Sequence, residues 1–180
     1  MEIKNILYIN LENRPDRKVH VEKQLESVGL NGTRFSAIKM ANGRVGCSMS
    51  HLKCLQLAKE KRWDHVFICE DDITFTKPDV FKAQMAKFLS SEHQVVKNWD
   101  VCIVGGNNLP PFQQIDDYCI RVTHCQTTTG YIVKEHYYDK LIANYREGIT
   151  RLIHEPEKHI MFAIDKFWLQ LQKIDKWFLI

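Results

Sequence analysis

The sequence lacks the features that identify several large classes of protein. Basic and acidic residues nearly balance, 25 against 22, so the formal net charge is only +3. Proteins that bind phosphate backbones usually carry a concentrated basic surface, so nucleic acid is not an expected partner. No stretch approaches the ~20 consecutive apolar residues of a membrane-spanning helix. Residues 1–10 read as a strand and not as a signal peptide, so we expect a cytoplasmic location.

Other absences concern chemistry. The six cysteines form no Cys-x-x-Cys pair, which argues against a structural zinc site and favours buried free thiols, although an even number leaves disulfides open for a secreted chain. There is no Gly-x-Ser-x-Gly elbow, so a Ser-His hydrolase is not favoured. No repeat or Gly/Ser linker divides the chain. Its length is typical of one domain, and we expect a single domain over residues 1–180.

Apolar, β-branched runs alternate with segments of helical periodicity along most of the chain. The predicted strands cover residues 3–10, 33–38, 63–69, 99–104, 119–123 and 130–133. The first predicted helix follows an N-cap at Asn13. The other predicted helices cover residues 47–62, 78–89 and 135–145. Residues 107–118 read as a long loop after the Gly-Gly that ends a strand. This alternation favours an α/β/α sandwich with a mainly parallel central sheet.

The last fifteen residues, 166–180, are rich in large apolar side chains. They are too apolar to remain a free tail, so we expect them to dock on the core or on a partner. If the segment docks on a partner, we expect that partner to be a membrane surface or a second copy of the chain.

Three consecutive acids, Glu70-Asp71-Asp72, come directly after an apolar run that is predicted to be a strand. In an extended chain Glu70 and Asp72 point to one side and Asp71 to the other, so two carboxylates can converge on one hard cation. The alternative is a solvated strand end. Open α/β sheets bind ligands beyond the carboxyl ends of their strands, and this position favours a binding role.

Two arginines stand where the first predicted strand leads into the first predicted helix. Asn10 and Leu11 end the strand, and Arg14 and Arg17 follow at the helix start, where free backbone amides and guanidinium groups both favour anions. Ordinary surface arginines are the alternative. Ser50 and His51 open the second predicted helix and could line the same crevice; alternatively they serve as a cap and a partly buried helix residue.

Taken in order, these motifs resemble glycosyltransferase family 25, which includes lipopolysaccharide-type sugar transferases and collagen galactosyltransferases. The resemblance rests on Tyr8–Leu11 with Arg14–Arg17, Gly46–Leu52, Ile68–Asp72, Thr129–Val133 and Ile164-Asp165. It implies a GT-A-like (Rossmann-like) fold, a UDP-sugar donor carrying galactose or glucose, a divalent metal that is commonly Mn²⁺, and a hydroxyl acceptor on a glycan or glycoprotein. It maps the family's Asp-x-Asp-like motif onto the three consecutive acids.

On this interpretation each candidate residue has a role. We expect Glu70 and Asp72 to hold the metal. The donor would be bound by Asn10, Leu11, Arg14, Arg17, Ser50, His51, Glu70 and Asp71. An inverting transferase also needs a base for the acceptor hydroxyl, and the candidate is Asp165. Capping of the last helix is the alternative for Asp165. His154 and His159 are candidates for further metal ligands, with ordinary surface histidines as the alternative.

Two other functions are compatible with the same residues. The first is a catalytically weak or inactive nucleotide-sugar or glycan-binding module that acts with a partner. This alternative is motivated by the C-terminal side, where the sequence ends fifteen residues after Asp165, so that we expect a shortened transferase domain. The second is a metal-dependent phosphohydrolase, which would use the three acids and leave the other ordered motifs unexplained.

Overall fold

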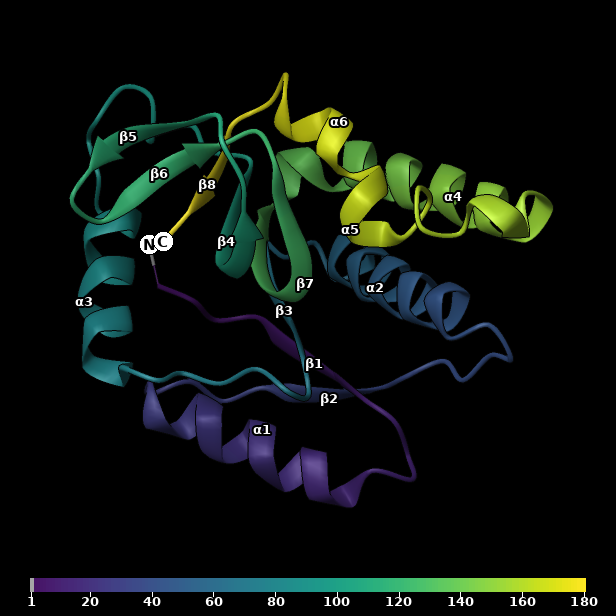
Figure 1. Ribbon diagram of the computed structural model, residues 1–180. Coiled ribbons are helices and arrows are strands. Elements are labelled where there is room, and N and C mark those ends of the chain that lie inside the picture. Colours follow the sequence, from purple (N-terminus) through teal and green to yellow (C-terminus); the bar gives the residue numbers. More distant parts are fainter. Residues whose placement is uncertain (1) are drawn as a thin grey trace.

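One eight-stranded sheet with helices on both faces runs through the computed structural model, which describes residues 2–180 (Figure 1). The strands are β1 (Ile6–Asn10), β2 (Thr33–Ser36), β3 (His65–Glu70), β4 (Val101–Asn108), β5 (Phe112–Asp116), β6 (Cys119–Val122), β7 (Cys125–Lys134) and β8 (Trp177–Leu179). Their order across the sheet is β2-β1-β3-β7-β4-β8-β6-β5.

The predicted α/β/α sandwich is confirmed, but the sheet is mixed and not mainly parallel. β1 runs parallel to β2 and β3, and β4 runs parallel to β8. The remaining pairings, β3 with β7, β4 with β7, β5 with β6 and β6 with β8, are antiparallel. The physical reason lies in the connections. Parallel neighbours need a long crossover, and from β4 to β7 the strands follow one another without an intervening helix.

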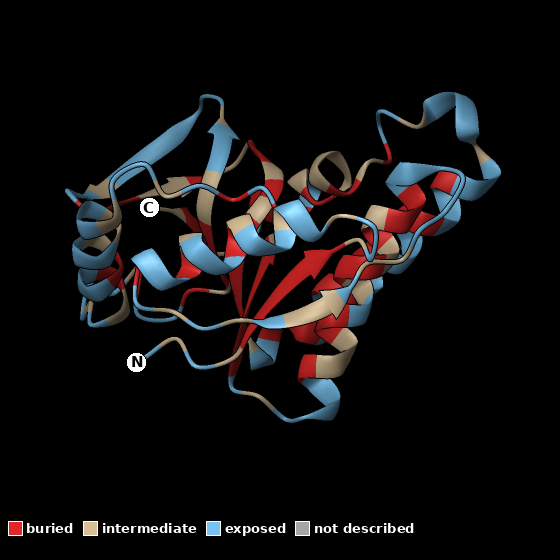
Figure 2. Cartoon of the chain, turned by 90° about the horizontal axis from the view of Figure 1, so that it is seen from below, coloured by how far each residue is buried: buried red, intermediate tan, exposed pale blue. Residues whose placement is uncertain are grey.

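The longer helices divide between the two faces of the sheet. They are α1 (Pro15–Ser27), α2 (Gly43–Glu60), α3 (Pro78–Leu89) and α4 (Tyr138–His154), the last preceded by the 3₁₀ turn η1 (Glu135–Tyr137). Leu55 of α2 and Leu141 of α4 pack in one apolar cluster, while Leu25 of α1 and Phe88 of α3 pack in another. Figure 2 shows the buried strands between these two layers.

Several predicted boundaries were wrong. β4 continues through the glycines to Asn108, and residues 112–116 form β5 in a hairpin with β6, where we expected a loop. α2 begins at Gly43, four residues before the predicted start, because Asn42 caps it by accepting a hydrogen bond from the backbone N–H of Arg44 at 3.0 Å. The cap of α1 is Arg14 and not Asn13.

The C-terminal residues are part of the core. After the 3₁₀ turn η2 (Pro156–Lys158) come two short helices, α5 (Ile164–Phe167) and α6 (Leu169–Gln172), and then β8. Trp168, Trp177 and Phe178 are fully buried, and β8 lies between β4 and β6. The predicted docking on the core is confirmed, so these three side chains do not offer a surface for a membrane or a second copy of the chain.

Two expectations about cysteines and membranes bear on the fold. Within residues 2–180 all six cysteines are free, and five of them are buried. The prediction of free thiols is thus confirmed. In that same part of the chain no helix is both long enough and apolar enough to cross a bilayer.

Candidate functional site

A cavity of about 340 Å³ opens at the carboxyl ends of β1 and β3, beside the start of α2. We call it the first cavity. Seven of the eight residues predicted to bind the donor line it: Leu11, Arg14, Arg17, Ser50, His51, Glu70 and Asp71. The eighth, Asn10, is buried and donates a hydrogen bond from Nδ2 to Asp71 Oδ2 at 2.8 Å. The structure therefore brings the predicted donor-binding set together.

A second cavity, of about 390 Å³, adjoins the first. Glu70, Asp72 and Asp165 line it, together with the threonines of residues 127–129. Gly43, Cys47 and Glu70 line both cavities, so they form the boundary between them. The two predicted metal ligands and the predicted base thus face one space.

The three consecutive acids have three different environments. Asp71 is buried, and besides Asn10 it contacts Arg17, whose Nη1 lies 3.1 Å from Asp71 Oδ1. About half of the Asp72 side chain is exposed, on the side of the second cavity. The burial of its other half and the neighbouring charge of Glu70 raise its pKa, and Arg17 offsets part of this rise. Glu70 and Asp72 share the second cavity, which Asp71 does not line. The expected extended chain nevertheless ends at Glu70, because Asp71 and Asp72 lie in a turn that the N–H of Ile73 closes by donating to the carbonyl of Glu70 at 3.3 Å.

A network of hydrogen bonds from buried side chains holds Glu70 in place. His51 is fully buried, with Nε2 3.2 Å from Glu70 Oε1 and Nδ1 2.8 Å from the hydroxyl of Tyr131. The Thr128 hydroxyl donates to the same Glu70 oxygen, and Tyr145 donates to the Tyr131 hydroxyl at 3.1 Å. These contacts hold the carboxylate of Glu70 in one orientation at the boundary of the cavities.

The charges of this pair stabilise each other. Burial lowers the pKa of His51, but hydrogen bonds with Cys47 and Glu70 outweigh it and raise the pKa to about 9. Burial likewise tends to raise the pKa of Glu70, and the hydrogen bonds from His51 and Thr128 reverse this and lower it. Glu70 is therefore ionised at neutral pH although it is largely enclosed.

Asp165 is held by the backbone of Thr127, a residue with an unusual conformation. Its Oδ2 accepts a hydrogen bond from the backbone N–H of Thr127 at 3.2 Å. Thr127 has φ of 78°, a left-handed conformation that is strained for a β-branched residue, and it lies where the β4–β7 register shifts. Ala163, and not Asp165, is the N-cap of α5, so the capping alternative was wrong.

Some predicted residues have their polar groups engaged inside the protein. The Ser50 hydroxyl donates to the carbonyl of Gly46 at 2.8 Å and accepts from the N–H of Ile38 at 2.9 Å, so it ties α2 to the cavity wall. Arg14 pairs with Asp16 through two hydrogen bonds, of 2.9 and 2.7 Å. His154 and His159 bond to backbone carbonyls of their own segments and line neither cavity.

Comparison with known families places the chain in one of them. The sequence profile of "Glycosyltransferase family 25 (LPS biosynthesis protein)" matches residues 39–167. The chain belongs to glycosyltransferase family 25. The matched range contains Cys47, His51, the three acids and Asp165, whereas the arginines of the first cavity lie before it.

Curated relatives agree with the assignment to family 25. Proteins named "Glycosyltransferase 25 family member" from Drosophila pseudoobscura pseudoobscura and Anopheles gambiae are 25% and 21% identical to this chain, over 74% and 93% of it. The chain spans only 26% and 31% of those proteins.

Two solved structures share the GT-A-like fold. One is a glycosyltransferase involved in the glycosylation of the major capsid of PBCV-1, with a TM-score of 0.51 and 11% identity, covering 99% of this chain and 92% of that one. The other is a mannose-1-phosphate geranyltransferase from Thermus thermophilus, with a TM-score of 0.57 and 7% identity, covering 100% and 74%. At such identities the likeness concerns the fold.

Three residues of this site were not predicted from the sequence. Cys47 stands four residues before His51, and this spacing on one helix face was a usable signal. Thr128 and Tyr131 hold Glu70 and His51, but their roles depend on how β7 pairs with β3 and β4, and no local pattern reveals that pairing.

Proposed function

We propose that this family 25 domain transfers a hexose, galactose or glucose, from a UDP-sugar to a hydroxyl of a glycan or glycoprotein, with inversion at the anomeric carbon. One observation carries the proposal. A cavity with arginines at its rim adjoins a cavity with three carboxylates, and Glu70 lies on the boundary. Such a pair of cavities suits a nucleotide diphosphate on one side and a reacting sugar with its acceptor on the other.

The first cavity is suited to the nucleotide. Ile9, Ala37 and Ile38 give it apolar walls, while Arg14 and Arg17 supply positive charge at one side. Flat bases favour apolar walls and phosphates favour guanidinium groups, so both parts of UDP find complementary chemistry.

The second cavity is suited to a divalent cation. Glu70 and Asp72 both line it, and the raised pKa of Asp72 reflects burial and the proximity of Glu70, which a bound cation would relieve. Carboxylate oxygens are the ligands that hard ions such as Mn²⁺ prefer. A metal held there would neutralise the charge of the departing diphosphate.

Asp165 is the proposed base. Its carboxylate lines the second cavity, and the N–H of Thr127 holds one oxygen, which leaves the other free to accept a proton from an acceptor hydroxyl. Removal of that proton while the anomeric carbon is attacked from the face opposite the leaving group gives inversion.

The test is a thermal-shift and turnover panel with UDP and UDP-hexoses, with and without Mn²⁺. We expect UDP with Mn²⁺ to raise the melting temperature, and we expect Asp72→Asn to remove the Mn²⁺-dependent part of the shift. Asp79→Asn changes an exposed acid that pairs with Lys82 on α3 and should leave the shift unchanged. No shift with any nucleotide would refute the proposal. A shift without sugar transfer or donor hydrolysis would favour the binding module that acts with a partner.

A further inference from the structure

The boundary between the two cavities carries a cluster of metal-binding atoms that the proposed Mn²⁺ pair does not explain. The thiol of Cys47, an imidazole nitrogen of His51 and a carboxylate oxygen of Glu70 all lie within 4.8 Å of one another. From this cluster we infer a second metal site, which binds a borderline-soft divalent transition metal of the Zn²⁺ class.

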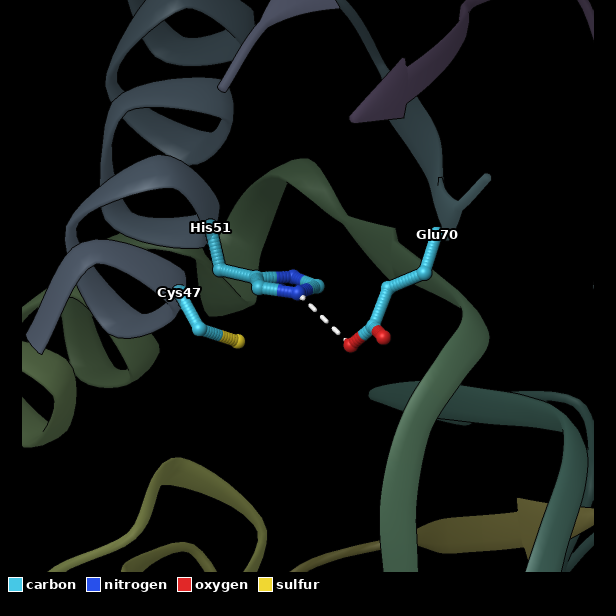
Figure 3. A group of neighbouring side chains, drawn as sticks. All are labelled: Cys47, His51 and Glu70. Carbon is cyan, nitrogen blue, oxygen red and sulfur yellow. Dashed lines mark hydrogen bonds and ion pairs between the residues drawn. The ribbon is translucent and has the colours of Figure 1, made fainter. Parts of the chain in front are cut away.

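The fold brings these three side chains together from two elements. Cys47 and His51 are four residues apart on α2, so they project from one face of the helix. Glu70 is the last residue of β3 and points at them from the sheet, as Figure 3 shows. Ligands from a helix and a strand that share the core have little freedom to separate.

The kinds of ligand decide the class of metal. Thiolate and imidazole are ligands for Zn²⁺ and related ions, whereas Mn²⁺, Mg²⁺ and Ca²⁺ favour sites made of oxygen atoms. Three protein ligands leave a fourth tetrahedral position, as in catalytic zinc sites. Because Cys47 and Glu70 line both cavities, that position is accessible to water or to a ligand oxygen.

The surrounding hydrogen bonds provide independent support. Metal-binding histidines usually have their second ring nitrogen held by a polar group, which fixes the ring. Here the Tyr131 hydroxyl lies 2.8 Å from His51 Nδ1, so Nε2 is the atom that faces Glu70. Thr128 in turn donates to Glu70. This arrangement orients two of the three ligands before any metal binds. Binding of the ion displaces to solvent the proton that His51 Nε2 shares with Glu70 and the proton of the Cys47 thiol.

The inference does not rest on the proposed transferase activity. It connects with that proposal only through Glu70, which belongs both to this cluster and to the Glu70–Asp72 pair. A zinc-class ion would therefore compete with Mn²⁺ for one carboxylate, and the two sites are distinguished by Cys47 on one side and Asp72 on the other.

Titration of the chelator-treated chain, residues 1–180, with Co²⁺, followed by absorption spectroscopy, tests the site. We expect one equivalent of Co²⁺ to give tetrahedral bands in the visible region and a thiolate-to-metal charge-transfer band, and Zn²⁺ to displace both. Cys47→Ser should abolish the charge-transfer band. Cys119→Ser removes one thiol from β6 on the opposite face of the sheet and should keep it. Absence of the band, or its persistence in Cys47→Ser, would overturn the inference.

Melting temperatures provide a second measurement that does not depend on the spectrum. Zn²⁺ should raise the melting temperature of the unmodified chain and of Asp72→Asn, but not that of His51→Gln. Circular dichroism of each variant without metal checks that it is folded. An equal Zn²⁺ shift in His51→Gln would assign the ion to other thiols and refute this site. Loss of the Mn²⁺ response in Asp72→Asn together with a retained Zn²⁺ response would show that the two sites are separate.

Discussion

The two ends of β3 use buried polar groups in opposite ways. At the carboxyl end, Glu70 bonds to the side chains of His51 and Thr128 at the boundary of two cavities. At the amino end, His65 is as deeply buried as His51, and its Nε2 accepts the backbone N–H of Lys4 at 3.1 Å while its carbonyl accepts from Asn5 at 3.0 Å. The one carboxylate beside its ring, that of Asp64 at 2.8 Å from Nδ1, is exposed to solvent.

The two histidines show what this difference means. Burial lowers the pKa of both, and at His65 it outweighs the opposing effect of Asp64, so the pKa stays below its usual value. At His51 the hydrogen bonds with Cys47 and Glu70 reverse the effect of burial. Depth alone therefore does not identify a functional residue. Both histidines lie beside a carboxylate, but Asp64 is exposed to solvent, whereas Glu70 is held by further hydrogen bonds at the boundary of two cavities.

The largest expected effect is a loss of activity without a loss of stability, at the cavities beside the carboxyl end of β3. Asp165→Asn should lower kcat by about 10²- to 10⁴-fold, because a general base contributes on that order. The free energy of unfolding should change little, since an asparagine oxygen still accepts the Thr127 N–H. Steady-state kinetics and urea unfolding measure the two quantities. Asp139→Asn, an exposed acid on α4, is the control, and equal losses of turnover in both variants would contradict the role of Asp165.

The second effect concerns packing beside the first cavity. A Cβ at Gly46 would lie 2.5 Å from the carbonyl oxygen of Ile38, so Gly46→Ala must push α2 from the cavity wall. We expect a loss of about 1–3 kcal/mol in the free energy of unfolding. Gly43→Ala is the matched control on the same helix, because nothing lies within 4 Å of its Cβ position. The interpretation fails if urea unfolding shows equal losses for the two variants.

The third effect tests the amino end of β3 by pH. The folded pKa of His65 is lowered, so below about pH 6.5 the unfolded chain binds the proton that the folded protein excludes. Stability should fall as the pH drops through that range, by at most about 1.4 kcal/mol per pH unit from this one group. Urea unfolding gives the free energy of unfolding of the unmodified chain and of His65→Gln at each pH, and the difference between the two isolates the effect of His65. If this difference is constant from pH 7 to pH 5, His65 is not held neutral.

The smallest effect concerns the rim of the first cavity. Arg14→Gln should weaken UDP binding only a few-fold, because partly exposed charge pairs contribute about 0.2–1 kcal/mol. Asp16→Asn should act in the opposite direction, because it releases the Arg14 guanidinium from its present partner. Calorimetric titration with UDP measures both, and a change of the same sign in the two variants would exclude Arg14 from phosphate binding.

Local signals in the sequence predicted one helix correctly at both of its ends. The helix of residues 78–89 matched α3 at both ends, since a proline opens it and Ser90 follows with its own side chain bonded back to the helix. Leu11, Glu70 and Asp71 of the first cavity were also predictable, because they lie at the carboxyl ends of two strands that pair with each other.

The remainder depends on pairings between distant residues. Nothing near residues 125–134 shows that they insert antiparallel between β3 and β4, yet this insertion places Thr128 and Tyr131 behind Glu70 and His51. The strain at Thr127 arises from the same register shift. In the chain order of the motifs, Asp165 is far from the acids, and only the tertiary fold shows that it faces Asp72 across one cavity.

The position of β8 also constrains how this domain is made. Residues 177–179 form an inner strand, hydrogen-bonded to β4 on one side and to β6 on the other. Until they have left the ribosome, the β5–β6 hairpin is not hydrogen-bonded to any other strand of the sheet, and β4 presents an open edge of the kind that pairs with other chains. Synthesis of the domain therefore includes an interval in which most of the sequence is present but the sheet is still in two parts. Removal of these few residues by a protease or a stop codon would make that interval permanent.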